Sequence, residues 1–319
     1  KVSPKQPLFI LMQRTLLILI FFCSWSITQT FSQSNPIEIT YTRDETKKEY
    51  TFQYKNPNYC DYSVKVEFTS LQGGSCSCVL PYLSAVSAGN GSLFTIKPSQ
   101  ANQGISFQFG YKTLKGRLLN KPPKPFIYLF PFSKKEAHRA NQTQNIVEML
   151  SGKKVTNFYG MSFQMQKGDT AFAARRGVVS EIKNEFATHS EEVWFSTNTN
   201  FVEIFHQDGT FGRYNRFKMG TIMVKPGQSV EAGQPLGIVA DDTFEGNTLA
   251  QFTVYYLDKA KAFTEAHSFS YLVPTFYTTT HPAGVVLQQG AFYTSDFPES
   301  IVTQEMSKRE LKKWKETKQ

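Results

Sequence analysis

The stretch VKPGQSVEAGQPLG at residues 224–237 decides the fold, because short apolar segments alternate in it with glycine turns. The same style extends on its N-terminal side, where residues 173–179 read AARRGVV and residues 205–217 read FHQDGTFGRYNRF. Short β-prone runs separated by glycine turns are typical of antiparallel sheets. Residues 157–258 are therefore expected to form a compact, strongly twisted antiparallel sheet.

The composition favours a mainly β protein with more than one domain. The chain has 319 residues, of which 28 are Phe and 15 are Tyr, and aromatic residues are frequent in strands. Before the central sheet, residues 37–41, 50–54, 62–68 and 105–109 alternate apolar and polar side chains, which is typical of a half-buried antiparallel sheet. We therefore expect an antiparallel β-sandwich over residues 33–119.

The rest of the domain organisation follows from changes in composition. Residues 120–125 read NKPPKP, and their prolines predict a stiff linker. The second β domain is expected over residues 126–275, with the polar segment 133–157 as a loop containing a short helix. Residues 276–319 are expected to be a C-terminal extension that ends in a basic helix, because residues 303–315 combine strong helix formers with lysine.

The N-terminus predicts export. Residues 1–32 carry Arg14, then an apolar run over residues 16–23 and a polar end, which is the pattern of a secretory signal peptide. The run is short for a bilayer span, so no transmembrane span is expected after cleavage; the alternative is a retained anchor. Cleavage removes three basic residues and leaves a net charge of +9 − 3 = +6. That charge suits an anionic periplasm, extracellular space or cell envelope, and no basic motif points to nucleic acid.

Three cysteines remain after such a cleavage. Exported proteins form disulfides, so we expect a bridge from Cys60 to either Cys76 or Cys78, with one thiol left over. The spacing does not match a zinc knuckle.

The motifs of residues 157–258 resemble the lysostaphin/LytM-type zinc metallopeptidases, which cut peptide cross-links in bacterial peptidoglycan. The frame matches at residues 163–168 and 173–179, at the turn of residues 206–209, and in the lipoyl-like tract of residues 224–237. The resemblance implies the twisted β domain already expected. It also implies a zinc site made by a first His, an Asp, and the second His of a closing His-x-His, with two auxiliary histidines.

Each of those functional positions carries a different residue in this chain. The first His falls at Phe158 in the compact spacing, or near Lys153 if the loop is longer. Ser162 stands at the position of the Asp. Arg216, two residues after Tyr214, stands at the position of the His in the Tyr-x-His-Leu segment, and Leu249 and Gln251 stand at the final His pair. With Phe158, these residues are expected to line the groove that binds substrate in the family.

These replacements oppose zinc binding. Phe and Leu cannot ligate a metal, a neutral Ser is a poor zinc ligand, and a Gln amide is a weak one. Arg216 would place a fixed positive charge beside a dication. No cofactor is therefore expected, although the family uses zinc. His206 is the one motif histidine retained, and in the family this His is no ligand, so a structural or surface role is expected.

The sequence leaves three functions open. The first is an inactive metallopeptidase-like envelope protein that binds peptidoglycan peptides or regulates a cell-wall hydrolase through the residual groove. The second is an active metalloendopeptidase with non-family ligands, for which Asp241, Asp242 and Glu245 are candidates better suited to Ca²⁺ than to Zn²⁺. The third is a structural envelope component. Whether the chain is an enzyme is left undecided, with an inactive protein favoured.

Overall fold

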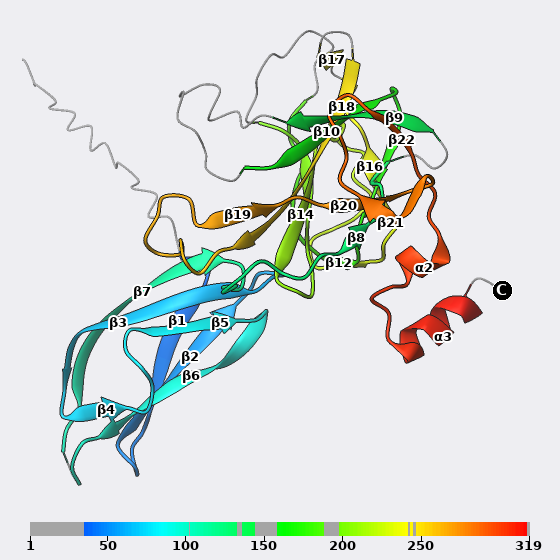
Figure 1. The fold of residues 1–319 in the computed structure, drawn as a ribbon. Coiled ribbons are helices and arrows are strands. Elements are labelled where there is room, and N and C mark those ends of the chain that lie inside the picture. The colour runs from blue at the N-terminus through cyan, green and yellow to red at the C-terminus, as the bar shows by residue number, and fades with distance from the viewer. Residues whose placement is uncertain are drawn as a thin grey trace, which may run out of the picture. The chain divides into compact units, whose positions relative to one another are not determined.

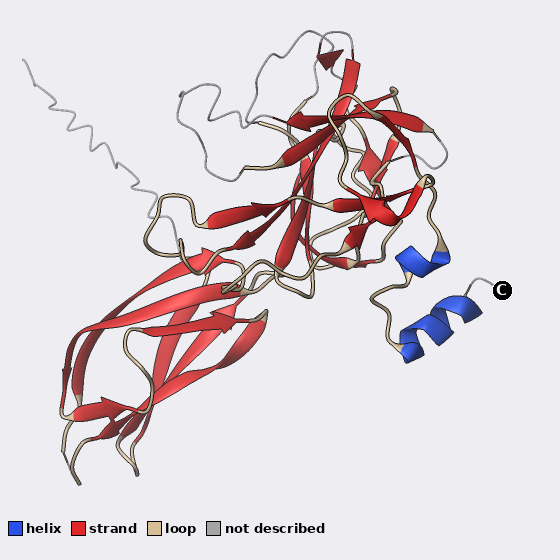
Figure 2. Ribbon diagram, in the orientation of Figure 1, coloured by secondary structure: helices blue, strands red, loops and turns tan. Residues whose placement is uncertain are grey.

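The computed structural model describes residues 35–101, 103–132, 136–143, 158–187, 198–241, 243–244 and 247–317. The expected signal peptide lies outside these residues. The described chain is mainly β, as predicted (Figures 1 and 2). In the part of the chain that is described, no helix has the length and apolar character needed to cross a membrane.

The first half is an antiparallel sandwich, as the alternating segments predict. One sheet has the order β1-β2-β6-β4 and the other β5-β3-β7. Their inward side chains include Phe52, Val64 and Ile96, and Phe52 stacks on Phe94 with ring centroids 4.6 Å apart. The strands are β1 (Glu38–Asp44), β2 (Glu49–Asn56), β3 (Tyr62–Gln72), β4 (Gly74–Cys76), β5 (Tyr82–Val86), β6 (Gly89–Pro98) and β7 (Ser106–Lys115).

The second half is built on a ten-stranded sheet. Its main order is β15-β12-β13-β14-β18-β10-β9-β22, with β17 and β19 also paired to β18. Its strands are β9 (Ala137–Thr143), β10 (Gly160–Met165), β12 (Gly177–Lys183), β13 (Phe201–Phe205), β14 (Thr210–Asn215), β15 (Ser229–Val230), β17 (Thr243–Phe244), β18 (Asn247–Leu257), β19 (Phe269–Leu272) and β22 (Phe292–Thr294).

Two small sheets complete this half. β11 (Thr170–Phe172) pairs with β16 (Pro235–Ile238), and β20 (Thr275–Thr278) lies between β21 (His281–Val285) and β8 (Ile127–Tyr128). The predicted division after residue 275 therefore falls inside a strand. β22 also pairs with β9, so residues beyond 275 contribute to the sheets of this half.

Of segment 133–157, which was expected to be a loop with a short helix, the structure describes residues 136–143, and the rest lies outside the described residues. Residues 137–143 form β9, which pairs with β10 on one side and β22 on the other. Its sequence is AHRANQT, in which the final Thr143 is the one β-branched residue, so the local signal for a strand is weak. The pairing with two neighbouring strands, rather than local propensity, makes this segment extended.

The predicted C-terminal helix is confirmed at α3 (Lys308–Glu316), which follows a short α2 (Glu299–Val302). Ser307 and Glu310 form a capping box, which satisfies backbone N–H groups at the start of α3. The segment is tied to the sheet by charge, because the buried Arg175 bonds Glu305 at 2.6 Å and Arg176 bonds Glu310 at 2.8 Å.

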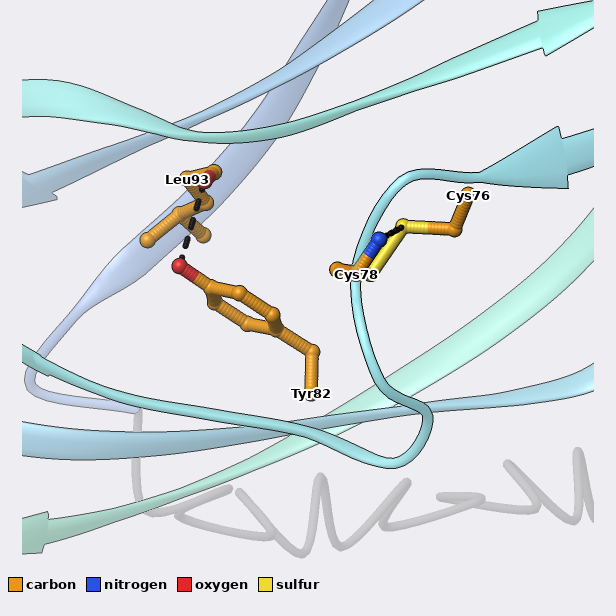
Figure 3. Close-up of a disulfide and its surroundings, with 4 residues drawn as sticks. All are labelled: Cys76, Cys78, Tyr82 and Leu93. Carbon is orange, nitrogen blue, oxygen red and sulfur yellow. Dashed lines mark hydrogen bonds between the residues drawn. A yellow bond between two sulfur atoms is a disulfide. The ribbon is translucent and has the colours of Figure 1, made fainter.

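The disulfide prediction was wrong. The bridge joins Cys76 to Cys78, at the end of β4 (Figure 3). Cys60 is a buried free thiol. Burial raises the pKa of the Cys60 thiol to about 12, so it stays protonated and unreactive near neutral pH. Cys60 is 3% exposed in the apolar core of the sandwich, against which the bridged Cys76 and Cys78 also pack.

A buried charge cluster joins the end of β7 to the large sheet. The Lys115 ammonium lies 2.5 Å from carboxylate oxygens of both Glu203 on β13 and Glu181 on β12. Glu203 is only 1% exposed, and it also accepts hydrogen bonds from the hydroxyls of Ser180 and Tyr255. Burial alone would lower the pKa of Lys115, but the two carboxylates outweigh it and raise that pKa.

Lys115→Met is expected to destabilise the protein by about 3 kcal/mol, because it removes the hydrogen-bonded cation of the buried Glu203 carboxylate and leaves it with Arg213 at 3.9 Å. Glu181→Gln is the matched control, since it removes the exposed partner of the same lysine and should cost less than about 1 kcal/mol. Urea unfolding measures both. Equal losses for the two variants would contradict the assignment of the stability to the buried pair.

Candidate functional site: a polar face on β10, β14 and β18

The positions expected to hold a metal meet on one face of the large sheet. Along β10, Met161 and Phe163 point into the core, so Ser162 between them points to the other face. Along β18, Ala250 and Phe252 are core residues and Gln251 faces away from them. Ser162 and Gln251 are direct cross-strand partners. The register therefore brings together two positions that are 89 residues apart in the chain.

A polar row crosses four strands at this level. Asn141 on β9 pairs with Ser162, and Asn215 on β14 pairs with Gln251. The Ser162 hydroxyl donates to the Asn141 carbonyl at 3.5 Å, and Arg213 Nε donates to Asn215 Oδ1 at 3.1 Å. We call these four residues, Asn141, Ser162, Gln251 and Asn215, the polar row.

The sequence interpretation missed Asn141 and Asn215. Asn141 lies in the segment expected to be a loop. Asn215 lies directly after the apolar Tyr214 in the same strand. Because side chains alternate between the two faces of a strand, this order could have predicted that Asn215 points to the outer face.

Phe158 and Leu249 supply apolar surface to the same face. The Phe158 ring packs edge-on against Tyr271 of β19, with centroids 4.8 Å apart. It also lies over Gly160, where a Cβ would come within 3.1 Å of the ring and 3.0 Å of Thr253. The glycine therefore lets the Phe158 ring lie close to the strand. Leu249 is half-buried and precedes Gln251 by two residues on β18, so it shares that face.

Arg216 lies just beyond the end of β14 with a positive φ of 75°. Its N–H donates to the Asn200 carbonyl at 2.9 Å, and its carbonyl accepts from the Ala240 N–H at 2.8 Å. The side chain is half-buried. These hydrogen bonds stabilise a left-handed backbone conformation, which is unfavourable for a residue other than glycine. They thereby fix the direction in which the Arg216 side chain starts from its Cα atom.

Tyr214 is no part of this face, contrary to the prediction. It is 1% exposed, belongs to the core, and accepts a hydrogen bond from the Ala174 N–H at 2.7 Å. Burial raises the pKa of its hydroxyl. The alternation of β14 explains the difference, since neighbouring residues of a strand point to opposite faces.

The donors on this face do not fit Zn²⁺. A hydroxyl from Ser162 and an amide from Gln251 face each other where zinc requires imidazole, thiolate or carboxylate, and Phe158 supplies no donor. The alternative ligand Asp241 is already engaged, because its carboxylate lies 2.7 Å from Lys218 and 3.8 Å from Lys167. Asp242 and Glu245 lie outside the described residues.

The twisted sheet and the facing positions on β10 and β18 define a metallopeptidase-like β domain. Residues 156–262 match the model of peptidase family M23. No curated protein sequence matches the chain.

Three of the solved structures to which the chain is similar are the following. One is a putative glycyl-glycine endopeptidase LytM from Ruminococcus gnavus, with 13% identity, a TM-score of 0.30, and coverage of 46% of this chain and 57% of that chain. The match thus spans little more than half of that protein. Another is Helicobacter pylori Csd3, with 13% identity, a TM-score of 0.28, and coverage of 73% and 75%. The third is a zinc-containing peptidase from Vibrio cholerae, with 12% identity, a TM-score of 0.27, and coverage of 68% and 82%.

The retained motif histidine, His206, is structural. It is fully buried, and one ring nitrogen, Nδ1, lies 2.8 Å from the Arg176 carbonyl, which makes it the donor. Next to it, Asp208 caps the turn through Thr210 and bonds Arg175 at 2.7 Å. Burial, and then the positive charge of Arg175, lower the pKa of His206 to about 3.

This shift predicts a loss of stability in mild acid. In the folded protein His206 stays neutral down to about pH 3, whereas in the unfolded chain it takes up a proton below its ordinary pKa of 6.5. Stability from this group is therefore complete above pH 6.5 and falls as the pH falls, by about 1.4 kcal/mol per pH unit.

His206→Asn should remove that slope, because its amide can still donate to the Arg176 carbonyl but does not titrate. Unfolding free energies at pH 7, 6 and 5 measure it. The parent curve should converge on that of the variant as the pH falls, and two parallel curves would refute the assignment.

Proposed function

We propose that this chain binds peptidoglycan peptides on the face of the polar row without hydrolysing them. The observation that carries the proposal is the pairing of Ser162 with Gln251 at the positions where the family resemblance implies metal ligands. Side chains that do not fit zinc stand there, while the family's frame around them is kept. An exported envelope protein is the setting that this function requires.

The chemistry of the face supports peptide binding. The amides of Asn141, Gln251 and Asn215 each offer donors and an acceptor, which suit the N–H and C=O groups of an extended peptide. Phe158 and Leu249 offer apolar contacts beside them. Arg216, which follows Asn215 in the chain, has a guanidinium whose planar fork suits a carboxylate, and peptidoglycan stem peptides carry carboxylates.

Other functions are less well supported. Of the candidate ligands for an active metalloendopeptidase, the Asp241 carboxylate is engaged by Lys218 and Lys167, and Asp242 and Glu245 lie outside the described residues. Regulation of a separate cell-wall hydrolase is compatible with the same face, because a bound hydrolase loop would present the same peptide groups. A purely structural component would leave the face unused.

We expect the purified chain to bind soluble muropeptides in calorimetry and to leave them uncleaved, as read by mass spectrometry. Gln251→Leu removes the central amide at similar volume, and Arg216→Ala removes the guanidinium. Each should weaken binding about tenfold or more, which corresponds to about 1.4 kcal/mol.

Arg309→Ala on α3 is the matched control for charge, since it removes an exposed arginine outside the polar row and should leave the affinity unchanged. Cleavage of the muropeptides by the parent chain would refute the proposal. Binding that survives both Gln251→Leu and Arg216→Ala would instead favour the structural role.

A further inference from the structure

A second group of polar side chains lies near the end of β10 and the turn that leads to β11. It consists of Glu136, His138 and Asp169. One ring nitrogen of His138 and one carboxylate oxygen from each acid all lie within 4.8 Å of one another. The three residues come from two places in the chain, the start of β9 and the turn of residues 166–169.

His138 is the distinctive member of this cluster. It is 3% exposed and packs against two aromatic rings, with the Phe130 centroid 5.9 Å away and the Phe132 centroid 6.3 Å away. Its Nδ1 lies 3.0 Å from the Gln164 carbonyl, which makes Nδ1 the donor. Within the described residues, its buried Nε2 has no hydrogen-bond partner. A buried ring nitrogen with a free lone pair is costly unless something binds it.

This arrangement is the one that metal-binding histidines use. Such a histidine normally donates its other N–H to a carbonyl or carboxylate, which fixes the ring and directs its lone pair at the metal. In this chain the Gln164 carbonyl fixes the His138 ring in that way.

The two carboxylates are placed to complete the site. Asp169 is half-buried, and one of its oxygens accepts the Gln166 N–H at 2.8 Å, so the turn holds its side chain. Glu136 is exposed, and its side chain is able to rotate toward the other two. Tetrahedral ligands at zinc lie about 3.4 Å apart, so the cluster needs to contract by an ångström or so. Rotation of the Glu136 side chain supplies part of this contraction.

We propose that Glu136, His138 and Asp169 bind a divalent transition metal, for which Zn²⁺ is the probe. One imidazole and two carboxylates are an N/O donor set that zinc accepts, with a fourth position left for water. The metal would join β9 to the turn that follows β10.

The proposed site is separate from the polar row. The Phe163 ring contacts both Phe130 and Phe132, so His138 lies on the core side of β10. Ser162 and Gln251 point to the opposite face. The inference therefore does not rest on the proposed function.

The test is the zinc content and zinc affinity of the metal-stripped full chain. The parent chain should bind one Zn²⁺ and melt at a higher temperature with zinc than without it. His138→Phe replaces the imidazole with an apolar ring beside Phe130 and Phe132, and Asp169→Asn keeps an acceptor for the Gln166 N–H. Each should weaken zinc binding at least tenfold and abolish the rise in melting temperature.

Gln251→Leu is the matched control and should bind zinc like the parent. If His138→Phe does not fold, the zinc affinity of Asp169→Asn tests the site, because this change lies in a turn near the surface and is expected to leave the fold intact. Failure of the parent to bind zinc would overturn the inference, as would undiminished zinc affinity in Asp169→Asn. Loss of zinc in Gln251→Leu would overturn it too, because the metal would then lie on the polar row.

Discussion

The pairing of Ser162 with Gln251 across β10 and β18 is the constraint on which the second half of the molecule depends. A strand's side chains alternate between faces, so a slip of one residue would exchange the core face with the outer face. With this register, Phe163 and Phe252 enter the core and the polar residues between them share the outer face. The same pairing that builds the core therefore also aligns the polar row.

Two ion pairs with a buried member connect distant parts of the chain around this sheet. Lys115, at the end of the last strand of the sandwich, forms an ion pair with Glu203 in the large sheet. Arg175 connects the turn after β11 to Glu305 in the C-terminal segment. Each contact is between a cation and a carboxylate that would be costly to bury alone. The frame of an M23 domain is thus held by charge pairs as well as by its apolar core.

The sequence predicted those parts of the fold that have a regular period. The sandwich strands alternate cleanly, and the glycine turns of residues 224–237 mark the second sheet. β9 was missed because its residues are polar and its extended form comes from two neighbouring strands. Tyr214 was misplaced because a motif gives the order of residues but not the face of the strand. Cys60 was paired wrongly because its burial in the sandwich core leaves no trace in the spacing of the cysteines.

The candidate site was predicted only in part, because a motif gives the order of residues but not their neighbours across strands. Ser162 and Gln251 were found from the motif frame, since their positions follow from the order of the family's segments. Asn141 and Asn215 follow only from the register, and the cluster around His138 follows only from the packing of Phe130 and Phe132. Sequence patterns identify residues that stand in for known ligands, whereas contacts across strands identify their neighbours.

The most direct test of the central claim, that the family frame is intact and only its metal donors are replaced, is to restore the donors and count zinc. In a His138→Phe background, which removes the other site, the three changes Phe158→His, Ser162→Asp and Gln251→His place two imidazoles and a carboxylate on one face. Metal analysis of the purified protein should give about one Zn²⁺ per chain with the three changes and none in the background alone. Zinc held by the background chain, or no zinc gained on restoration, would contradict the account.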